Sequence, residues 1–134
     1  LGVQRVDKDT LLADSDILSV HLVLSDRTRG LIAANDIAKM KPTAYLVNTS
    51  RGPIVDEPAL IDALSAGRIA GAGLDVFEVE PLPLDHAFRQ LTNTVITPHL
   101  GYVTQETYET FYGEACEAMK AYLEGAPIRV LNSG

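Results

Sequence analysis

The chain has a single cysteine, Cys116, among its 134 residues, so no disulfide can form within it. A disulfide-stapled secreted scaffold is therefore excluded, and a reducing cytoplasm is the expected location. The sequence also has no run of 18 apolar residues, so we expect no membrane-spanning helix. Its N-terminal segment lacks the charged, apolar and small-residue regions of a signal peptide.

Basic residues are scarce. Lys and Arg number 11 against 18 Asp and Glu, which gives a net charge of −7. An acidic protein is repelled by nucleic-acid phosphates and by anionic lipid, so neither partner is expected. The three histidines, His21, His86 and His99, are far apart in the sequence and have none of the close spacings of a zinc site, so we expect no metal.

The composition is that of a globular protein, with 46% hydrophobic and 22% charged residues. Its length suits one domain with a real core but not two complete domains. The first residue is Leu1, and residues 3–6 are predicted to form a short strand. We therefore expect this chain to be a fragment that enters the middle of a fold.

Apolar segments rich in β-branched residues alternate with segments of helical period. We predict strands at 17–23, 44–47, 69–76 and 94–97, and helices at 9–13, 35–40 and 57–66. Asp56 suits the N-cap of the last helix, and Gly67 suits its C-terminal cap. Strands that are apolar on both faces and alternate with helices predict an α/β fold, a parallel sheet covered by helices.

Polar residues follow three of the predicted strands where each one ends. Arg51 follows the second strand, Asp75 closes the third and His99 follows the fourth. Ligands bind beyond the carboxyl ends of parallel strands, so this edge of the sheet is the expected site. Asp75 is the most unusual of the three, because a carboxylate that ends an apolar strand is costly to bury without partners.

A long helix is predicted over residues 104–124. One face carries a broad aromatic and aliphatic stripe, and the other carries glutamates and a lysine. The stripe needs a surface to pack against, and we expect the rest of this chain to provide only part of it. Cys116 falls within the apolar run and is expected to be an inert, packed thiol.

Four side chains match the needs of hydride exchange between a nicotinamide and a 2-oxo acid. A guanidinium such as Arg51 can bind a substrate carboxylate, an imidazole such as His99 can exchange a proton, and Glu80 can orient that imidazole. Asp75 can accept a hydrogen bond from the nicotinamide carboxamide. Taken singly, each of these residues has a commoner structural explanation as a solvated, ion-paired or turn residue.

Taken together, the segments that hold these residues resemble a known family. Residues 48–57 (NTSRGPIVDE), 73–81 (GLDVFEVEP) and 97–101 (TPHLG) are similar, in order and spacing, to the three C-terminal signatures of the D-isomer-specific 2-hydroxyacid dehydrogenases. Residues 20–24 and 28–32 resemble the preceding family segment. The resemblance extends over nearly the whole chain.

The resemblance implies a Rossmann-type coenzyme domain of which only the C-terminal portion is present. Residues 1–103 would belong to that domain, and residues 104–134 would form the helix and tail that complete a substrate domain. The implied reaction is hydride transfer between NAD or NADP and C2 of a small 2-oxo or D-2-hydroxy acid of the glyoxylate, hydroxypyruvate, phosphoglycerate or lactate type. A homodimer formed through the coenzyme domain is also implied.

The resemblance further assigns roles to individual residues. Arg51, Glu80 and His99 match the catalytic set. The positions matched to cofactor binding are Leu22, Val23, Thr28, Thr49, Ser50, Arg51, Asp75, His99 and Gly101. Among the other histidines, His21 is expected to be a hydrogen-bonded structural residue, and His86 is assigned no role.

Several positions depart from the family pattern. Val23 stands where proline is common, and Tyr102 stands where many members have a second glycine. No Gly-x-Gly-x-x-Gly phosphate loop occurs, so the residue that chooses between NAD and NADP is also absent. Two alternatives therefore stay open: a non-catalytic, nucleotide-sensing module of the same fold, and an inactive piece of the dehydrogenase.

Overall fold

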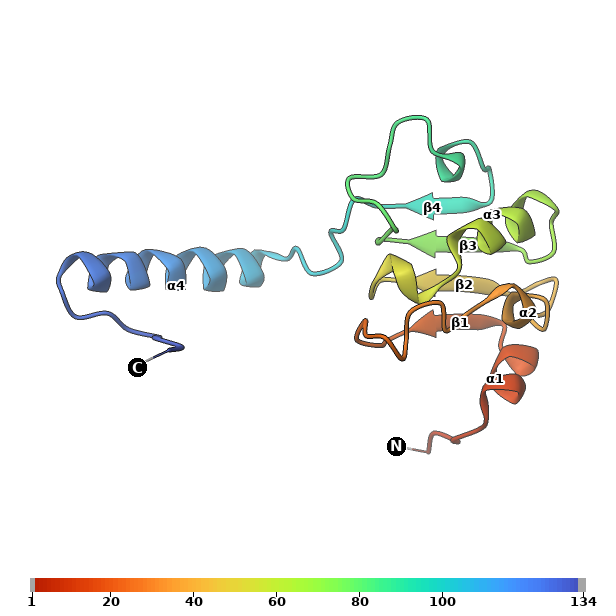
Figure 1. The fold of residues 1–134 in the computed structure, drawn as a ribbon, viewed down its shortest axis with the longest axis horizontal. Helices are drawn as coiled ribbons and strands as arrows, with labels where there is room; N and C mark the ends of the chain where they lie inside the picture. The colour runs from red at the N-terminus through yellow and green to blue at the C-terminus, as the bar shows by residue number, and fades with distance from the viewer. Residues whose placement is uncertain (1, 133–134) are drawn as a thin grey trace. The chain divides into compact units, whose positions relative to one another are not determined.

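The computed structural model describes residues 2–132, which fall into two compact units, Leu1–Gly101 and Tyr102–Gly134. The first unit contains every strand drawn in Figure 1. The second consists of one long helix and the segments around it. The assignment of residues 1–103 and 104–134 to two separate domains stays a prediction.

A four-stranded sheet forms the centre of the first unit. Its strands are β1 (Ile17–Val20), β2 (Tyr45–Asn48), β3 (Gly71–Leu74) and β4 (Thr94–Ile96), and they lie in the order β1-β2-β3-β4. All three pairings are parallel, so the predicted parallel α/β architecture is confirmed. The strands β1 and β3 are shorter than predicted, since β1 ends at Val20 instead of residue 23 and β3 covers residues 71–74 instead of 69–76.

Helices and short turns precede and connect the strands. They are α1 (Lys8–Asp14), α2 (Ala34–Ile37), α3 (Glu57–Ser65) and two 3-10 turns, Gly52–Ile54 and Ala87–Arg89. Helix α3 begins at its predicted residue, Glu57, and ends at Ser65, one residue earlier than predicted. The Asp56 side chain accepts a hydrogen bond from the Ala59 N–H at 3.0 Å, and Gly67 has the positive φ (63°) of a helix C-terminal residue.

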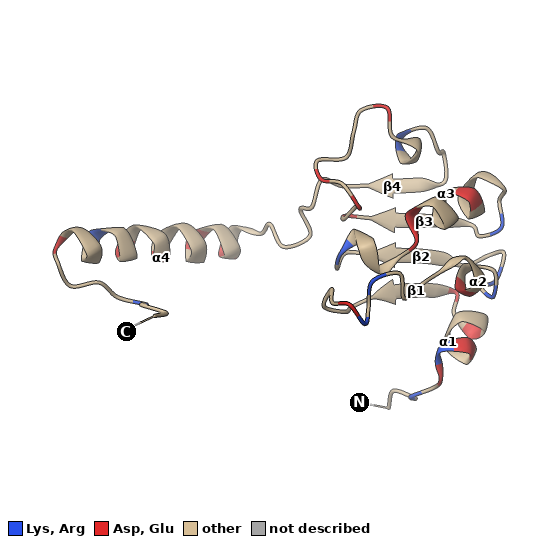
Figure 2. Cartoon of the chain, viewed as in Figure 1, with Lys and Arg blue, Asp and Glu red and all other residues tan. Residues whose placement is uncertain are grey.

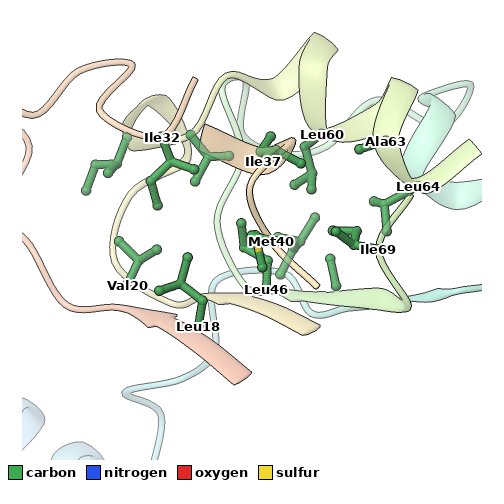
Figure 3. Packing of buried hydrophobic residues seen from close by; sticks show 14 of the residues in the cluster. Leu18, Val20, Ile32, Ile37, Met40, Leu46, Leu60, Ala63, Leu64 and Ile69 are labelled. Atoms are coloured by element: carbon green, nitrogen blue, oxygen red, sulfur yellow. The ribbon is translucent and has the colours of Figure 1, made fainter. Parts of the chain in front are cut away.

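The core lies on one face of the sheet. Figure 3 shows Leu18, Val20 and Leu46 of the strands facing Leu60 and Leu64 of α3. The opposite face is different. Ile17 is 66% exposed, Tyr45 51% and Val95 71%. The face that carries these three side chains is therefore largely exposed within the described residues.

The N-terminal segment corrects one prediction. Residues 3–6 form no strand, and the chain continues as coil until Asp7 caps α1 by accepting the Thr10 N–H at 2.9 Å. Val3 is 87% exposed, and this segment is paired with no strand in the described part of the chain. An extended segment without a neighbouring strand leaves its backbone N–H and C=O groups without sheet partners, so residues 3–6 form no strand.

The second unit contains α4 (Gln105–Leu123), which Thr104 caps through the Thr107 N–H. Acidic positions recur along it in Figure 2. None of its side chains is buried, and the predicted apolar stripe is exposed, with the rings of Tyr108 and Tyr112 stacked at 5.2 Å. Cys116 is exposed too, so the expectation of a packed thiol is not met within the described residues. Packing of α4 on a substrate domain stays a prediction.

Across residues 2–132, no helix combines the length and apolar character that crossing a bilayer requires.

Candidate active site

Three loops meet at the edge formed by the carboxyl ends of the strands, which we call the rim. The sheet ladder continues to this edge, because the Asp75 N–H donates to the Asn48 carbonyl at 3.0 Å and the Thr97 N–H donates to the Leu74 carbonyl at 2.9 Å. The residues that follow β2, β3 and β4 therefore all begin at the same edge of the sheet. The predicted convergence of three strand ends is confirmed.

Asp75 is a buried carboxylate at the centre of the rim, only 5% exposed. Its Oδ1 accepts hydrogen bonds from Thr97 Oγ1 at 2.5 Å and from the Leu100 N–H at 2.7 Å, and its Oδ2 accepts one from the Gly101 N–H at 2.8 Å. Burial acts to raise its pKa, but these three donors and the nearby charge of His99 hold the pKa below the usual 3.8.

These bonds fix the loop that carries His99. The backbone of His99 has a φ of 59°, a left-handed conformation that non-glycine residues rarely adopt. Two of the three donors to Asp75 are the backbone N–H groups of the residues that follow His99. Asp75 thereby compensates a backbone strain that costs on the order of 1 kcal/mol or more.

His99 and Glu80 form a close pair. The distance from His99 Nδ1 to Glu80 Oε2 is 2.6 Å, and the two side chains are 36% and 34% exposed. The other carboxylate oxygen, Oε1, accepts the Phe77 N–H at 2.9 Å. Burial raises the pKa of Glu80, but the bonds from His99 and Phe77 and the charges of His99 and Arg51 together lower that pKa below 4.5.

The loop that carries Arg51 is held by Asn48, which is only 1% exposed. The Asn48 side chain accepts the Ser50 N–H at 3.0 Å and donates to the Arg51 carbonyl at 3.0 Å. The guanidinium itself is exposed, and its Nη1 donates to the Ser50 carbonyl at 2.6 Å. The next residue, Gly52, lies against the backbone of the Glu80 loop, and its absent side chain permits that approach.

Two hollows adjoin these groups. The first, of about 650 Å³, is lined by His21, Leu22, Val23, Leu24, Ser50 and Arg51. The second, of about 360 Å³, is largely apolar and is lined by Phe77, Glu80, Pro81, Leu82, Pro98 and His99. Six of the site residues predicted from the sequence line these hollows at the surface beside the rim. Leu22, Val23, Ser50 and Arg51 line the first, and Glu80 and His99 line the second.

The remaining predicted residues are placed differently. The Thr28 hydroxyl is used inside its own loop, where it donates to the Val23 carbonyl at 2.7 Å and accepts the Ser25 N–H at 2.8 Å. Thr49 is exposed, and Gly101 contributes its N–H to Asp75. His21 is hydrogen-bonded as expected, with its Nε2 2.8 Å from Ser19 Oγ.

Sequence reasoning missed two kinds of residue. Thr97 and Asn48 hold the Asp75 and Arg51 loops, and their signal was only that each polar residue adjoins a predicted strand end. His86, to which no role was given, pairs with Glu57. In the described residues, no group of three or more His, Cys, Asp or Glu is arranged to hold a metal ion.

Comparison with known proteins identifies the chain's relatives. Residues 1–101 match the family model described as D-isomer specific 2-hydroxyacid dehydrogenase, NAD binding domain. The glyoxylate reductase of Thermofilum pendens is 48% identical over 124 residues, which cover 92% of this chain and 37% of the relative. This chain therefore spans little more than a third of that relative's length.

Solved structures give the same answer. An oxidoreductase from Ralstonia solanacearum superposes with a TM-score of 0.87 at 44% identity, over 95% of this chain and 37% of that one. A D-isomer specific 2-hydroxyacid dehydrogenase from Xanthobacter autotrophicus Py2, in complex with NADPH, has a TM-score of 0.72 at 40% identity, over 91% of this chain and 50% of that one. The resemblance read from the sequence is confirmed, and this chain belongs to the D-isomer specific 2-hydroxyacid dehydrogenase family, whose NAD binding domain it matches.

Proposed function

We propose that this chain is the catalytic part of an NAD(P)-dependent dehydrogenase that interconverts a small 2-oxo acid and its D-2-hydroxy acid. The observation that carries the proposal is the His99–Glu80 pair, placed on the same rim as Arg51. The relative from Thermofilum pendens is named a glyoxylate reductase and one from Enterobacter agglomerans a glyoxylate/hydroxypyruvate reductase, so glyoxylate and hydroxypyruvate are the first candidates to test, ahead of phosphoglycerate-type and lactate-type acids.

Arg51 would bind the substrate carboxylate. Its guanidinium is exposed beside the larger hollow and carries several donors in a planar fork, which suits two-point binding of a carboxylate. The same charge would polarise the neighbouring 2-oxo group. Asn48 and Gly52 fix the backbone on either side of Arg51, so little backbone entropy remains to be lost when substrate binds.

His99 would exchange the proton. With Nδ1 bonded to Glu80, the nitrogen that gives a proton to the substrate oxygen during reduction, and takes it back during oxidation, would be Nε2. Glu80 is ionised at neutral pH because its pKa is lowered, so its carboxylate binds His99 Nδ1 and orients the ring. This arrangement is why both residues are assigned to the catalytic set together with Arg51.

The larger hollow fits a nicotinamide ring and its ribose. It lies at the carboxyl ends of β1 and β2, and its lining combines apolar Leu22, Val23 and Leu24 with polar side chains. When bound, NADH or NADPH supplies the hydride. Leu22, Val23, Thr28, Thr49, Ser50 and Gly101 are the proposed neighbours of the cofactor, and Asp75 Oδ2 is the acceptor proposed for the carboxamide.

The direct test is a reduction assay on the full-length protein. Purified protein is incubated with NADH or NADPH and, separately, with glyoxylate, hydroxypyruvate, pyruvate and phosphohydroxypyruvate, and the loss of nicotinamide absorbance is followed. We expect turnover with at least one acid and one cofactor, and the ratio of the kcat/KM values names the preferred pair. No turnover with any combination would overturn the proposal in favour of a non-catalytic module.

We also propose that the protein forms a homodimer through its coenzyme domain, because the family resemblance implies one. A cytoplasmic location is proposed because the chain has a single cysteine. Sedimentation equilibrium of the full-length protein measures the first, since a mass of one chain at all concentrations would contradict it. Fractionation of the source cells measures the second.

A further inference from the structure

His86 and Glu57 form a second histidine–carboxylate pair, in addition to His99 and Glu80. His86 Nε2 is 3.0 Å from Glu57 Oε1, and the side chains are 19% and 18% exposed, about half the values for His99 and Glu80. Glu57 begins α3, whereas His86 precedes the 3-10 turn Ala87–Arg89, so the pair joins segments 29 residues apart.

The hydrogen bonds of His86 define its tautomer. The Phe88 N–H donates to His86 Nδ1 at 3.3 Å, so Nδ1 is an acceptor and carries no proton. The proton of the neutral ring is therefore on Nε2, from which it is donated to Glu57. The imidazole also lies 5.2 Å from the ring of Phe88, which is only 2% exposed, so His86 is anchored on the core.

Glu57 connects this pair to the active-site loop. Its second oxygen, Oε2, accepts the Glu78 N–H at 3.2 Å. The residue before Glu78 is Phe77, whose N–H holds Glu80 Oε1 at 2.9 Å. Glu57 thus binds the loop one residue away from the donor that positions Glu80, and the Phe77 ring lies 6.2 Å from Phe88 on the His86 side.

We propose that Glu57 and His86 are positioning residues. They hold the 77–80 segment, and thereby keep the Glu80 carboxylate within hydrogen-bonding distance of His99. The proposal rests on the function proposed above for the His99–Glu80 pair. His86 fixes one carboxylate oxygen of Glu57 so that the other faces Glu78, which is how a supporting shell of hydrogen bonds orients a reacting side chain.

Three substitutions separate positioning from general stability. Glu57→Gln keeps a carbonyl oxygen for His86 but presents N–H₂ to the Glu78 N–H, so the bond to the loop is lost. His86→Asn keeps an acceptor near the position of Nδ1 for Phe88 but cannot reach Glu57. His86→Gln can reach Glu57 with an amide N–H and is the conservative rescue. Asp16→Asn, which breaks the exposed Lys41–Asp16 ion pair, is the control.

Steady-state kinetics of the full-length variants, measured well below their melting temperatures, give the first readout. We expect Glu57→Gln and His86→Asn to lower kcat for 2-oxo acid reduction about tenfold, a loss usual for supporting residues. The KM should change less than about twofold, because Arg51 is untouched. His86→Gln should recover most of kcat, and Asp16→Asn should match wild type.

The second readout does not require activity. With histidine labelled selectively with ¹⁵N, the Nδ1–H proton of His99 in its short bond to Glu80 gives a downfield resonance. We expect Glu57→Gln and His86→Asn to shift or broaden it, and Asp16→Asn to leave it in place. An unchanged resonance with kcat within twofold of wild type in both variants overturns the proposal. A wild-type protein without turnover overturns the proposed function instead, and the resonance still decides whether Glu57 and His86 position Glu80.

Discussion

Gly52 lies so close to Phe77 that a Cβ added at Gly52 would come within 2.0 Å of the Phe77 carbonyl carbon and 2.1 Å of its oxygen. The contact joins two loops that leave different strands. Arg51 immediately precedes one side of it, and the segment leading to Glu80 forms the other. The spacing between Arg51 and Glu80 therefore depends on a backbone contact that only glycine permits.

Gly52→Ala is accordingly expected to be severe. The obstacle is backbone rather than a movable side chain, so the loops must separate, at a cost of about 1–3 kcal/mol in the free energy of unfolding. Urea unfolding measures that cost, and kcat/KM should fall with it because Arg51 and Glu80 move apart. Gly73→Ala is the matched control, since its Cβ would meet only Val47 at an ordinary 3.8 Å. Equal behaviour of the two variants would contradict the account.

Arg51 and His99 are expected to affect different kinetic constants. Arg51→Lys loses the planar fork, so the KM for the 2-oxo acid should rise about tenfold or more with a smaller change in kcat. His99→Gln removes the proton donor, and kcat should fall about 10²–10⁴-fold with KM little changed. Steady-state kinetics with the preferred cofactor check both, and small, equal effects would refute the two roles.

Asp75→Asn is expected to loosen the His99 loop. An amide offers one oxygen, and its N–H₂ would face either the Gly101 N–H or the donors Thr97 and Leu100. An unsatisfied buried donor costs about 1–3 kcal/mol, which urea unfolding should detect. Asp62→Asn on the exposed face of α3 is the control and should unfold like wild type. Stability unchanged by Asp75→Asn would mean that the loop holds its shape without the carboxylate.

The lowered pKa of Glu80 predicts a pH dependence of stability. Its folded pKa lies below the usual 4.5, so its contribution is present above about pH 4.5 and is lost as the pH falls through the folded value. The free energy of unfolding of Glu80→Gln should therefore be lower than that of wild type at pH 7, and the difference should shrink as the pH falls below 4.5. Urea titrations at several pH values measure this, and a constant difference down to pH 3 would exclude the linkage.

The sequence predicted the parts of this site that follow from strand ends. Arg51, Asp75 and His99 were placed on one rim because parallel strands deliver their carboxyl ends to one edge, and the sheet order confirms that. The need of Asp75 for partners was also foreseen. Its actual donors were not, because two of them are backbone N–H groups, and every residue except proline has one.

Contacts between segments that are far apart in the sequence were the main feature that the sequence did not predict. His86 carries no local pattern that points to Glu57, 29 residues earlier, so its role emerges only when the loop after β3 is seen folded against α3. The expectation that Cys116 is packed was not met for a different reason. A helical stripe indicates that a face is suited to burial, but it does not indicate what covers that face.

Asn48 has one more consequence, for covalent modification. Asn48-Thr49-Ser50 has the form of an N-glycosylation acceptor, Asn-x-Ser/Thr. The amide nitrogen that would carry the sugar donates to the Arg51 carbonyl in a side chain only 1% exposed. A glycan at this nitrogen would need space inside the sheet edge and would displace the Arg51 loop, so the folded protein and a sugar on Asn48 exclude each other.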